Sequence, residues 1–301
     1  MGFNIKYYII SIAAIFISLG IGIFIGFNMN GQEVYLKQHQ VLVDSLENRF
    51  VEFKREKESL EQNVRDLNTE REKLSVFVGN IFYEVVYNKL EGLNIAVIET
   101  TDRYFYDDIN ETLKLSGASI PVHVKYMDKI YNITEEQKRE INDLTERNLE
   151  KNEDFIDFIN NEIVNSFMSG DINHILNFLI DNEYIQYNCD FNGSENSNID
   201  SVVVTGGNSG SPEHSVGQLN VCLIKKLQEK QFRVIGMERS DVEQSHIPAF
   251  KDLNISTVDN VDSRMGKISL IYLLEGARGH YGEKPTADSL APFVVIDPSE
   301  E

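Results

Sequence analysis

Apolar residues are concentrated at the start of the chain. The sequence from Tyr7 to Phe27 is almost entirely apolar and contains no charged side chain. At about 1.5 Å per residue, a helix of this length crosses a hydrocarbon core of roughly 30 Å. The pattern predicts a membrane anchor at residues 1–31, with residues 7–27 in the lipid bilayer. A cleaved signal peptide is the alternative, but its apolar core would be shorter and end in small residues, whereas the sequence NMN follows here.

In the next segment, residues 32–90, the apolar residues recur in alternating steps of three and four. Such a heptad pattern places them on one stripe of a long helix, which only a partner helix can bury. We therefore expect a coiled-coil stalk that forms a homodimer. The register continues through Val78 and Val85, and its main seam residues are Leu46, Phe50, Phe53, Lys57, Leu60, Val64, Leu67, Arg71 and Leu74.

The pairing of the stalk stays open on the sequence alone. In a parallel homodimer Arg49 would face Lys54 of the partner, which is a repulsive pair and keeps antiparallel or heteromeric pairing as alternatives. A helix folded back on the domain that follows is a further alternative. Within the membrane span, Gly22 and Gly26 form a GxxxG motif that lets two spans approach closely.

From residue 91 onward, short β-branched runs alternate with helical segments. This alternation predicts an α/β domain at residues 91–301, with an open, mostly parallel sheet of the Rossmann or flavodoxin type. Residues 134–187 show no strand pattern, and the capping-box residues Thr134 and Gln137 favour a helical insertion there. The expected strands are 93–99, 119–126, 201–205, 232–238 and 256–259, and the expected helices are 104–116, 216–230, 247–253 and 263–274.

Charge and cysteine content narrow the possible functions. A formal net charge of −20 excludes most nucleic-acid roles and disfavours a domain lying flat on an anionic membrane. The two cysteines, Cys189 and Cys222, form no CxxC motif, and the six histidines show no HxxxH or HExxH spacing. The sequence therefore gives no disulfide framework, no local metal site and no cofactor motif. The few basic residues near the span do not fix its orientation.

Open α/β sheets bind ligands beyond the carboxyl ends of their strands. The glycine-rich loop that begins at Thr205 leads from a strand into a helix, where free backbone N–H groups could hold a small anion. It is neither a P-loop nor a GxGxxG motif, so a turn that needs glycine is the alternative. The candidate ligand-binding residues are Thr100, Asp102, Thr205, Gly206, Gly207, Asn208, Ser209, Gly210, Glu238 and Arg239.

The same loop carries a weak hydrolase pattern. Its sequence GNSGSP is similar to the nucleophile segment of trypsin-like proteases, but those proteases are β-barrels, whereas this segment joins a buried strand to a helix. The GxSxG motif fails because Ser211 replaces the last glycine. Ser209 and His214 have no identified carboxylate partner. We therefore expect no catalytic residues and no enzymatic activity.

Several segments together resemble one protein family. They are the stretch NIKYYIISIAAIFISLGIGIFIGFNMN, the heptads behind it, the strand LNIAVIE, the glycine loop and the terminal HYGEKPTADSLAP. The chain resembles, over almost its whole length, the MctB-like group named after the mycobacterial copper transport protein B. The resemblance implies copper homeostasis for a single-pass cell-membrane protein whose soluble domain is extracytoplasmic. Copper is implied by the resemblance alone, because no ligand motif of the family matches positions here.

Two alternative functions remain at this stage. A related corynebacterial branch is linked to cell separation with a partner protein, so the resemblance also implies a non-catalytic envelope scaffold. The glycine loop supports a small-anion-binding sensor or enzyme instead.

Overall fold

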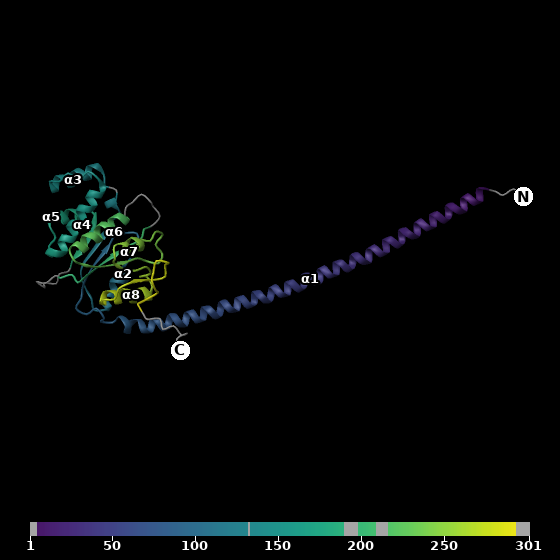
Figure 1. Ribbon diagram of the computed structural model, residues 1–301, viewed down its shortest axis with the longest axis horizontal. Helices are drawn as coiled ribbons and strands as arrows, with labels where there is room; N and C mark the ends of the chain where they lie inside the picture. Colours follow the sequence, from purple (N-terminus) through teal and green to yellow (C-terminus); the bar gives the residue numbers. More distant parts are fainter. Residues whose placement is uncertain (1–4, 132, 190–197, 209–215, 293–301) are drawn as a thin grey trace. The chain divides into compact units, whose positions relative to one another are not determined.

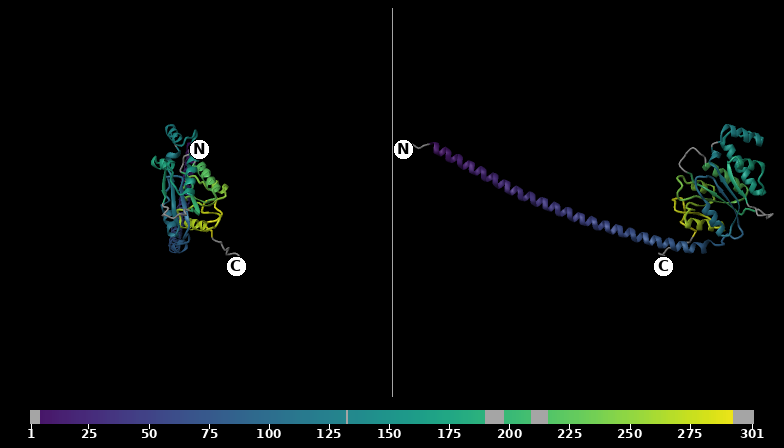
Figure 2. Two further views of the ribbon diagram at one scale, coloured as in Figure 1. Left: turned by 90° about the vertical axis from the view of Figure 1, so that its left-hand side faces the viewer. Right: turned by 180° about the vertical axis from the view of Figure 1, so that it is seen from behind.

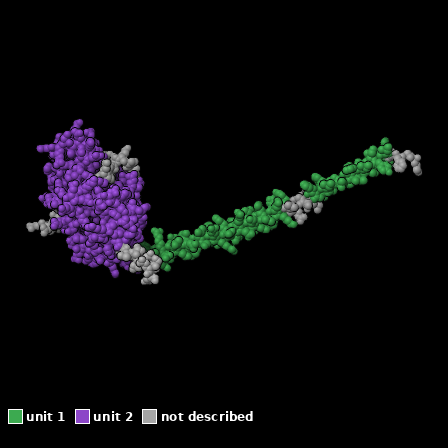
Figure 3. All heavy atoms as spheres, in the orientation of Figure 1, with its two compact units in different colours: residues 1–75 green, residues 76–301 purple. Residues whose placement is uncertain are grey.

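The computed structural model describes residues 5–131, 133–189, 198–208 and 216–292 (Figure 1). The chain divides into two compact units, residues 1–75 and residues 76–301 (Figure 3). In the first unit, the described residues, from Ile5 onward, are all helical. The second contains the end of that helix and the α/β domain.

The N-terminal helix α1 runs from Ile5 to Val86. No proline interrupts it, and its first part, Ile5–Phe27, is long and apolar enough to cross a membrane. The predicted apolar N-terminal helix is therefore confirmed. The chain leaves the helix at Asn88, whose φ of 53° is left-handed and cannot continue a right-handed helix.

The predicted seam of the stalk is exposed in the single chain. The apolar seam residues from Leu46 to Leu74 expose between 55% and 69% of their surface. A Cβ added at Gly22 or Gly26 would meet nothing within 4 Å. These positions are open to a partner helix, and their role in self-association stays a prediction. Two later heptad positions differ, because Val78 is half-buried and Val85 packs against the core of the second unit.

A seven-stranded sheet forms the centre of the α/β domain, in the order β3-β2-β1-β4-β5-β6-β7. The edge strand β3 is antiparallel to β2, and all other neighbours are parallel. The predicted mostly parallel sheet is confirmed, with the five expected strands near their predicted bounds. The strands are β1 Asn94–Glu99, β2 Ser119–Tyr126, β3 Ile185–Cys189, β4 Ser201–Thr205, β5 Arg233–Met237, β6 Ser256–Val258 and β7 His280–Tyr281.

Two strands were not predicted. The expectation that residues 134–187 contain no strand was wrong at its end, because β3 begins at Ile185. Along β3 only Ile185 and Tyr187 are buried, so its sequence IQYNC lacks the apolar run that marked the other strands. The second missed strand, β7, has only two residues, too few to produce a pattern.

The helices follow the predicted order. The capping box of α3 is present, since Thr134 N–H donates to Gln137 Oε1 at 2.9 Å and Gln137 N–H donates to Thr134 Oγ1 at 3.3 Å. The helix expected at 104–116 is shorter, because Tyr106 acts as its N-terminal cap. The helices after α1 are α2 Asp107–Leu115, η1 Asp128–Tyr131 (a 3-10 turn), α3 Glu135–Thr145, α4 Asn152–Ser169, α5 His174–Asp181, α6 Val216–Glu229, α7 Ile247–Asp252 and α8 Arg264–Glu275.

The sheet separates two apolar cores. Alternate residues of a strand point to opposite faces, so Val202 and Val204 join the core with α4 and α6, whereas Val203 joins the core with α2 and α8. The end of α1 packs into the second of these cores through Phe82 and Val86. The helices of the predicted insertion, α3 to α5, lie at one end of the domain, and α8 lies at the other end (Figures 1 and 2).

Candidate functional site

Two of the predicted site residues meet where the strand order changes direction, between β1 and β4. Thr100 N–H donates to Thr205 Oγ1 at 3.0 Å, and Thr100 Oγ1 donates to the carbonyl of Thr205 at 2.9 Å. The hydroxyl of Tyr131 donates to the carbonyl of Thr100 at 2.6 Å. Both threonines are fully buried and their polar groups bond to each other, so they join the two strands at this switch point.

Asp102 lies on the loop after β1 and faces a second carboxylate. Its Oδ2 accepts a long hydrogen bond, 3.5 Å, from the backbone N–H of Asp128. Burial, followed by the interaction with the side chain of Asp128 and repulsion from its charge, raises the pKa of Asp102 above its ordinary value, although the backbone N–H of Asp128 acts in the opposite direction. Arg103 pairs with Asp128 at 3.0 Å and partly offsets the local negative charge.

Two backbone N–H groups in the described part of the glycine loop, those of Gly206 and Asn208, form hydrogen bonds within the protein. Gly206 N–H donates to the carbonyl of Met237 at 2.6 Å. Asn208 and Gln244 exchange two backbone hydrogen bonds of 3.0 Å each. An anion at this loop would have to bind other N–H groups than those of Gly206 and Asn208.

Close packing explains one glycine of this loop. Gly207 has a φ of 89°, and a Cβ added to it would lie 2.4 Å from the side chain of Val242. The predicted site residues Ser209 and Gly210 lie outside the described residues. Anion binding by this loop therefore stays a prediction.

The predicted residue Glu238 is the centre of a buried polar cluster. Its side chain has an exposed fraction of 0%. Oε1 accepts from Ser245 Oγ at 2.5 Å and from Lys284 Nζ at 2.6 Å, and Oε2 accepts from the backbone N–H of His246 at 2.9 Å. A buried carboxylate needs such partners, and these three stabilise its charge. Sequence reasoning missed Lys284, which follows β7.

A second buried carboxylate holds the same C-terminal segment. Asp259 accepts hydrogen bonds from the backbone N–H groups of Glu283 and Lys284, at 2.7 and 3.0 Å. Gly282 approaches so closely that an added Cβ would lie 1.9 Å from Asp259 Oδ1. The segment after β7 thus crosses the carboxyl ends of β5 and β6 and occupies groups that a ligand would otherwise bind.

Arg239 is held at the surface of this edge. Its guanidinium binds Asp241 through Nε at 2.9 Å and Nη2 at 3.2 Å, while Nη1 donates to the carbonyl of Phe105 at 3.2 Å. The hydrogen bond from Arg239 holds the pKa of Asp241 below its ordinary value. Arg239 therefore connects the loops after β1 and β5.

A largely buried histidine, His246, is connected to the Thr205 carbonyl through Asn220 and was not predicted. Asn220 Nδ2 lies 3.0 Å from His246 Nδ1 and also donates to the carbonyl of Thr205 at 3.3 Å. Burial lowers the pKa of His246 to about 4, so the ring is neutral at physiological pH and accepts this hydrogen bond. An isolated histidine in the sequence gives no indication of which residues it contacts in the fold, so this contact could not be predicted.

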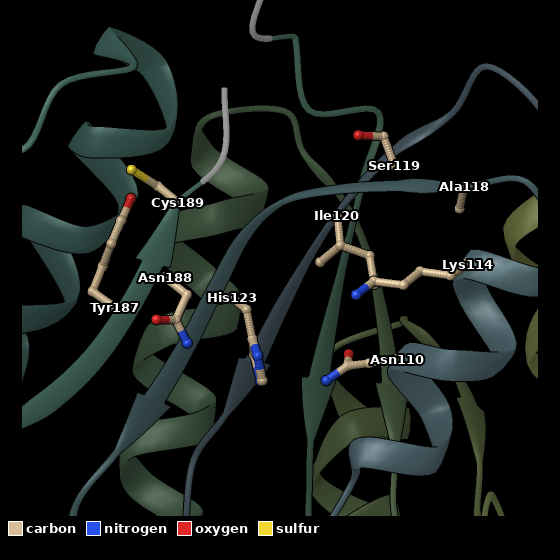
Figure 4. A pocket seen from close by; sticks show the side chains of 9 residues that line it. All are labelled: Asn110, Lys114, Ala118, Ser119, Ile120, His123, Tyr187, Asn188 and Cys189. Atoms are coloured by element: carbon tan, nitrogen blue, oxygen red, sulfur yellow. The ribbon is translucent and has the colours of Figure 1, made fainter. Parts of the chain in front are cut away.

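A cavity of about 650 Å³ lies elsewhere, between α2 and the strand pair β2 and β3 (Figure 4). None of the predicted site residues lines it. Its lining residues are far apart in sequence, which is why no local motif indicated them. The polar side chains around it are Asn110, Lys114, Ser119, His123, Asn188 and Cys189.

Within the described part of the chain, no three His, Cys, Asp or Glu side chains gather in a way that could hold a metal ion. The thiol of Cys222 donates to Asp157 Oδ1 at 2.7 Å, and burial together with Asp157 raises its pKa to about 11. Because metals bind the thiolate, this environment disfavours Cys222 as a ligand. Cys189 is an exposed free thiol on β3.

Comparison with protein families gives a match. The family model described as "Copper transport outer membrane protein, MctB" matches residues 3–292, which is nearly the whole chain. Comparison with curated proteins gives no match.

Proposed function

From the premise that this chain belongs to the MctB family, we propose that it is a membrane-anchored envelope protein that acts in copper homeostasis. The match over residues 3–292 carries this proposal, because it includes the apolar helix and the α/β domain together. We place the protein in the cell membrane, with a single span at Ile5–Phe27 and an extracytoplasmic domain. Copper is its cargo in this proposal rather than a resident cofactor.

We further propose that the protein works by binding rather than by catalysis. The carboxylates of Glu238 and Asp259, at the edge where α/β proteins bind ligands, accept hydrogen bonds from Lys284 and its neighbours. Groups that are committed to internal contacts are poorly suited to act as acid or base. The change of strand order between β1 and β4 supports a Rossmann or flavodoxin-like architecture for the domain.

Copper binding is tested by titrating the full chain in detergent with Cu(I) in the presence of a competing chelator. We expect stoichiometric binding tighter than about micromolar. Soft thiolates favour Cu(I), so the exposed Cys189 is the first ligand to test, and Cys222 provides a matched comparison. Cys189→Ser is expected to weaken binding more than Cys222→Ser. A full chain that binds no Cu(I) would remove copper as cargo.

The cellular role has a separate test. A deletion strain is expected to show altered copper tolerance and altered total copper, both restored by the intact gene. Unchanged tolerance and unchanged copper content would contradict the proposed role, whatever the purified protein binds.

A second candidate function is an envelope scaffold that acts in cell separation with a partner protein. The specific observation in its favour is the exposed apolar stripe on α1, where Phe50 exposes 69% and Leu67 65% of its surface. Such a stripe is stable in water only when another helix covers it. We propose a coiled-coil homodimer that presents two α/β domains to the partner. Deletion is then expected to cause cell chaining, and normal separation would exclude this role.

A further inference from the structure

The cavity beside the antiparallel edge of the sheet is polar on most of its surface. It lies between α2 and the strands β2 and β3, and its volume of about 650 Å³ falls within the roughly 300–1,000 Å³ of small-molecule sites. In Figure 4 the side chains of Asn110, Lys114, His123 and Asn188 point toward a common space. This arrangement suits a ligand that is itself mostly polar.

His123 is fixed by a buried carboxylate behind it. Glu99 is 1% exposed, and its Oε1 lies 2.8 Å from His123 Nε2. Glu99 Oε2 forms an ion pair of 3.2 Å with Lys125. A carboxylate at Nε2 favours the tautomer that carries its proton there, which leaves the lone pair of Nδ1 to accept a hydrogen bond. The strand thus presents an oriented acceptor.

Asn110 lies on the opposite wall, on α2. In Figure 4 its amide nitrogen points toward the space between α2 and β2. The Oδ1 atom of Asn110 is buried in the protein and does not face this space. The amide N–H groups can therefore donate hydrogen bonds to hydroxyl oxygens of a ligand.

The charge of the lining favours an anion. Lys114 extends from α2 into the cavity wall, and among the described residues it forms no ion pair. The lining residues in the described chain include no Asp or Glu. The buried carboxylate of Glu99 is engaged by His123 and Lys125, so Lys114 can attract a negatively charged group of the ligand.

We propose that this cavity binds a small hydroxylated carboxylate, which is the chemistry of an acidic sugar. Lys114 pairs with the carboxylate, Asn110 Nδ2 donates a hydrogen bond to one hydroxyl group, and His123 Nδ1 accepts a hydrogen bond from another. The thiol of Cys189 takes no part in this binding. Cys189 pairs with Val122, whose side chain lies in the core on the face opposite to His123, so the thiol and the imidazole do not converge.

The test is calorimetric titration of the full chain in detergent with galacturonic acid. We expect saturable binding with one site, and at least tenfold weaker binding of galactose, which lacks the carboxylate, and of acetate, which lacks the hydroxyl groups. Lys114→Met and Asn110→Ala should each weaken galacturonate binding at least tenfold. Lys225→Met removes an exposed lysine from α6 and should leave the affinity unchanged.

Opposite results would overturn the proposal. The proposal fails if galacturonate shows no saturable binding, or if galactose binds with the same affinity. It also fails if neither Lys114→Met nor Asn110→Ala changes the affinity for galacturonate. Lys114 is exposed, so its variant is expected to fold even where Asn110→Ala does not. Titration with a galacturonate tetramer distinguishes two sources of the ligand. If the tetramer binds more tightly than the monomer, the ligand is the end of a polymer. If the two bind with equal affinity, the ligand is the free acid.

Discussion

The buried carboxylate of Glu238 lies 2.6 Å from Nζ of Lys284, a residue 46 positions later in the chain. This ion pair fastens the C-terminal segment across the carboxyl ends of the central strands. Lys284 Nζ also donates to the carbonyl of Arg239 at 3.3 Å. The pair therefore links β5, the loop after it and the segment after β7.

Removing the lysine should destabilise the domain strongly. Lys284→Met leaves a buried, uncompensated charge on Glu238, which typically costs about 3 kcal/mol or more. Chemical denaturation of the full chain in detergent measures this loss. The double variant Glu238→Gln with Lys284→Met should recover part of it, because no charge is left buried. Lys251→Met breaks the more exposed pair with Asp288 and should cost about 1 kcal/mol or less.

The close approach at Gly282 is tested by comparing it with another glycine of similar conformation. Gly282 has a φ of 144° and Gly276 a φ of 134°, but only Gly282 has neighbours, with Asp259 Oδ1 at 1.9 Å from an added Cβ. Alanine is strained at both positions. Gly282→Ala should therefore destabilise by about 2 kcal/mol more than Gly276→Ala, owing to the clash alone. If thermal unfolding shows that the two variants lose equal stability, Asp259 does not restrict the space at Gly282.

His246 should make stability depend on pH. Burial lowers its pKa from 6.5 to about 4 in the folded state, so between these values the unfolded chain binds a proton that the folded protein does not. The unfolding free energy should therefore fall by up to about 3 kcal/mol as the pH decreases through this window. His246→Gln, which keeps an acceptor for Asn220, should flatten that part of the profile. His174→Gln, at an exposed position on α5, should leave the profile unchanged.

The local pattern of the sequence was sufficient for most of the sheet. Strands such as β4 are buried on both faces, so their continuous β-branched runs were visible without any knowledge of the fold. The edge strand β3 is buried only at Ile185 and Tyr187, and it was missed for that reason.

The site was harder to predict, because its contacts join distant positions. Thr100 and Glu238 were selected as residues after strands, which is a local feature. Their partners Thr205 and Lys284 depend on strand order and on the course of the C-terminal segment. The lining of the cavity likewise combines α2, β2 and β3, and β3 itself was not predicted.

The two thiols should react at very different rates. Cys189 is exposed, whereas burial and the hydrogen bond to Asp157 raise the pKa of Cys222 to about 11. Alkylation requires the thiolate, so at pH 8 a maleimide should label Cys189 rapidly and Cys222 slowly. Mass spectrometry of the full chain measures both rates. Asp157→Asn should accelerate labelling of Cys222 and leave Cys189 unchanged, and equal rates in the unmodified protein would contradict the buried environment.

The heptad register of α1 should serve two different purposes along its length. Leu60 exposes 58% of its surface, whereas Val85, in the same register, packs against the core that includes Leu113 and Ile271. Leu60→Asp should therefore abolish self-association, measured by analytical ultracentrifugation in detergent, without changing the unfolding of the α/β domain. Val85→Asp should lower the domain's unfolding free energy by about 3 kcal/mol through burial of an unpaired charge. Because Val78 is half-buried and Val85 packs against this core, pairing between helices should end near Leu74. A Leu60→Asp protein that stays dimeric would place the contact outside this seam, in the membrane span or the α/β domain.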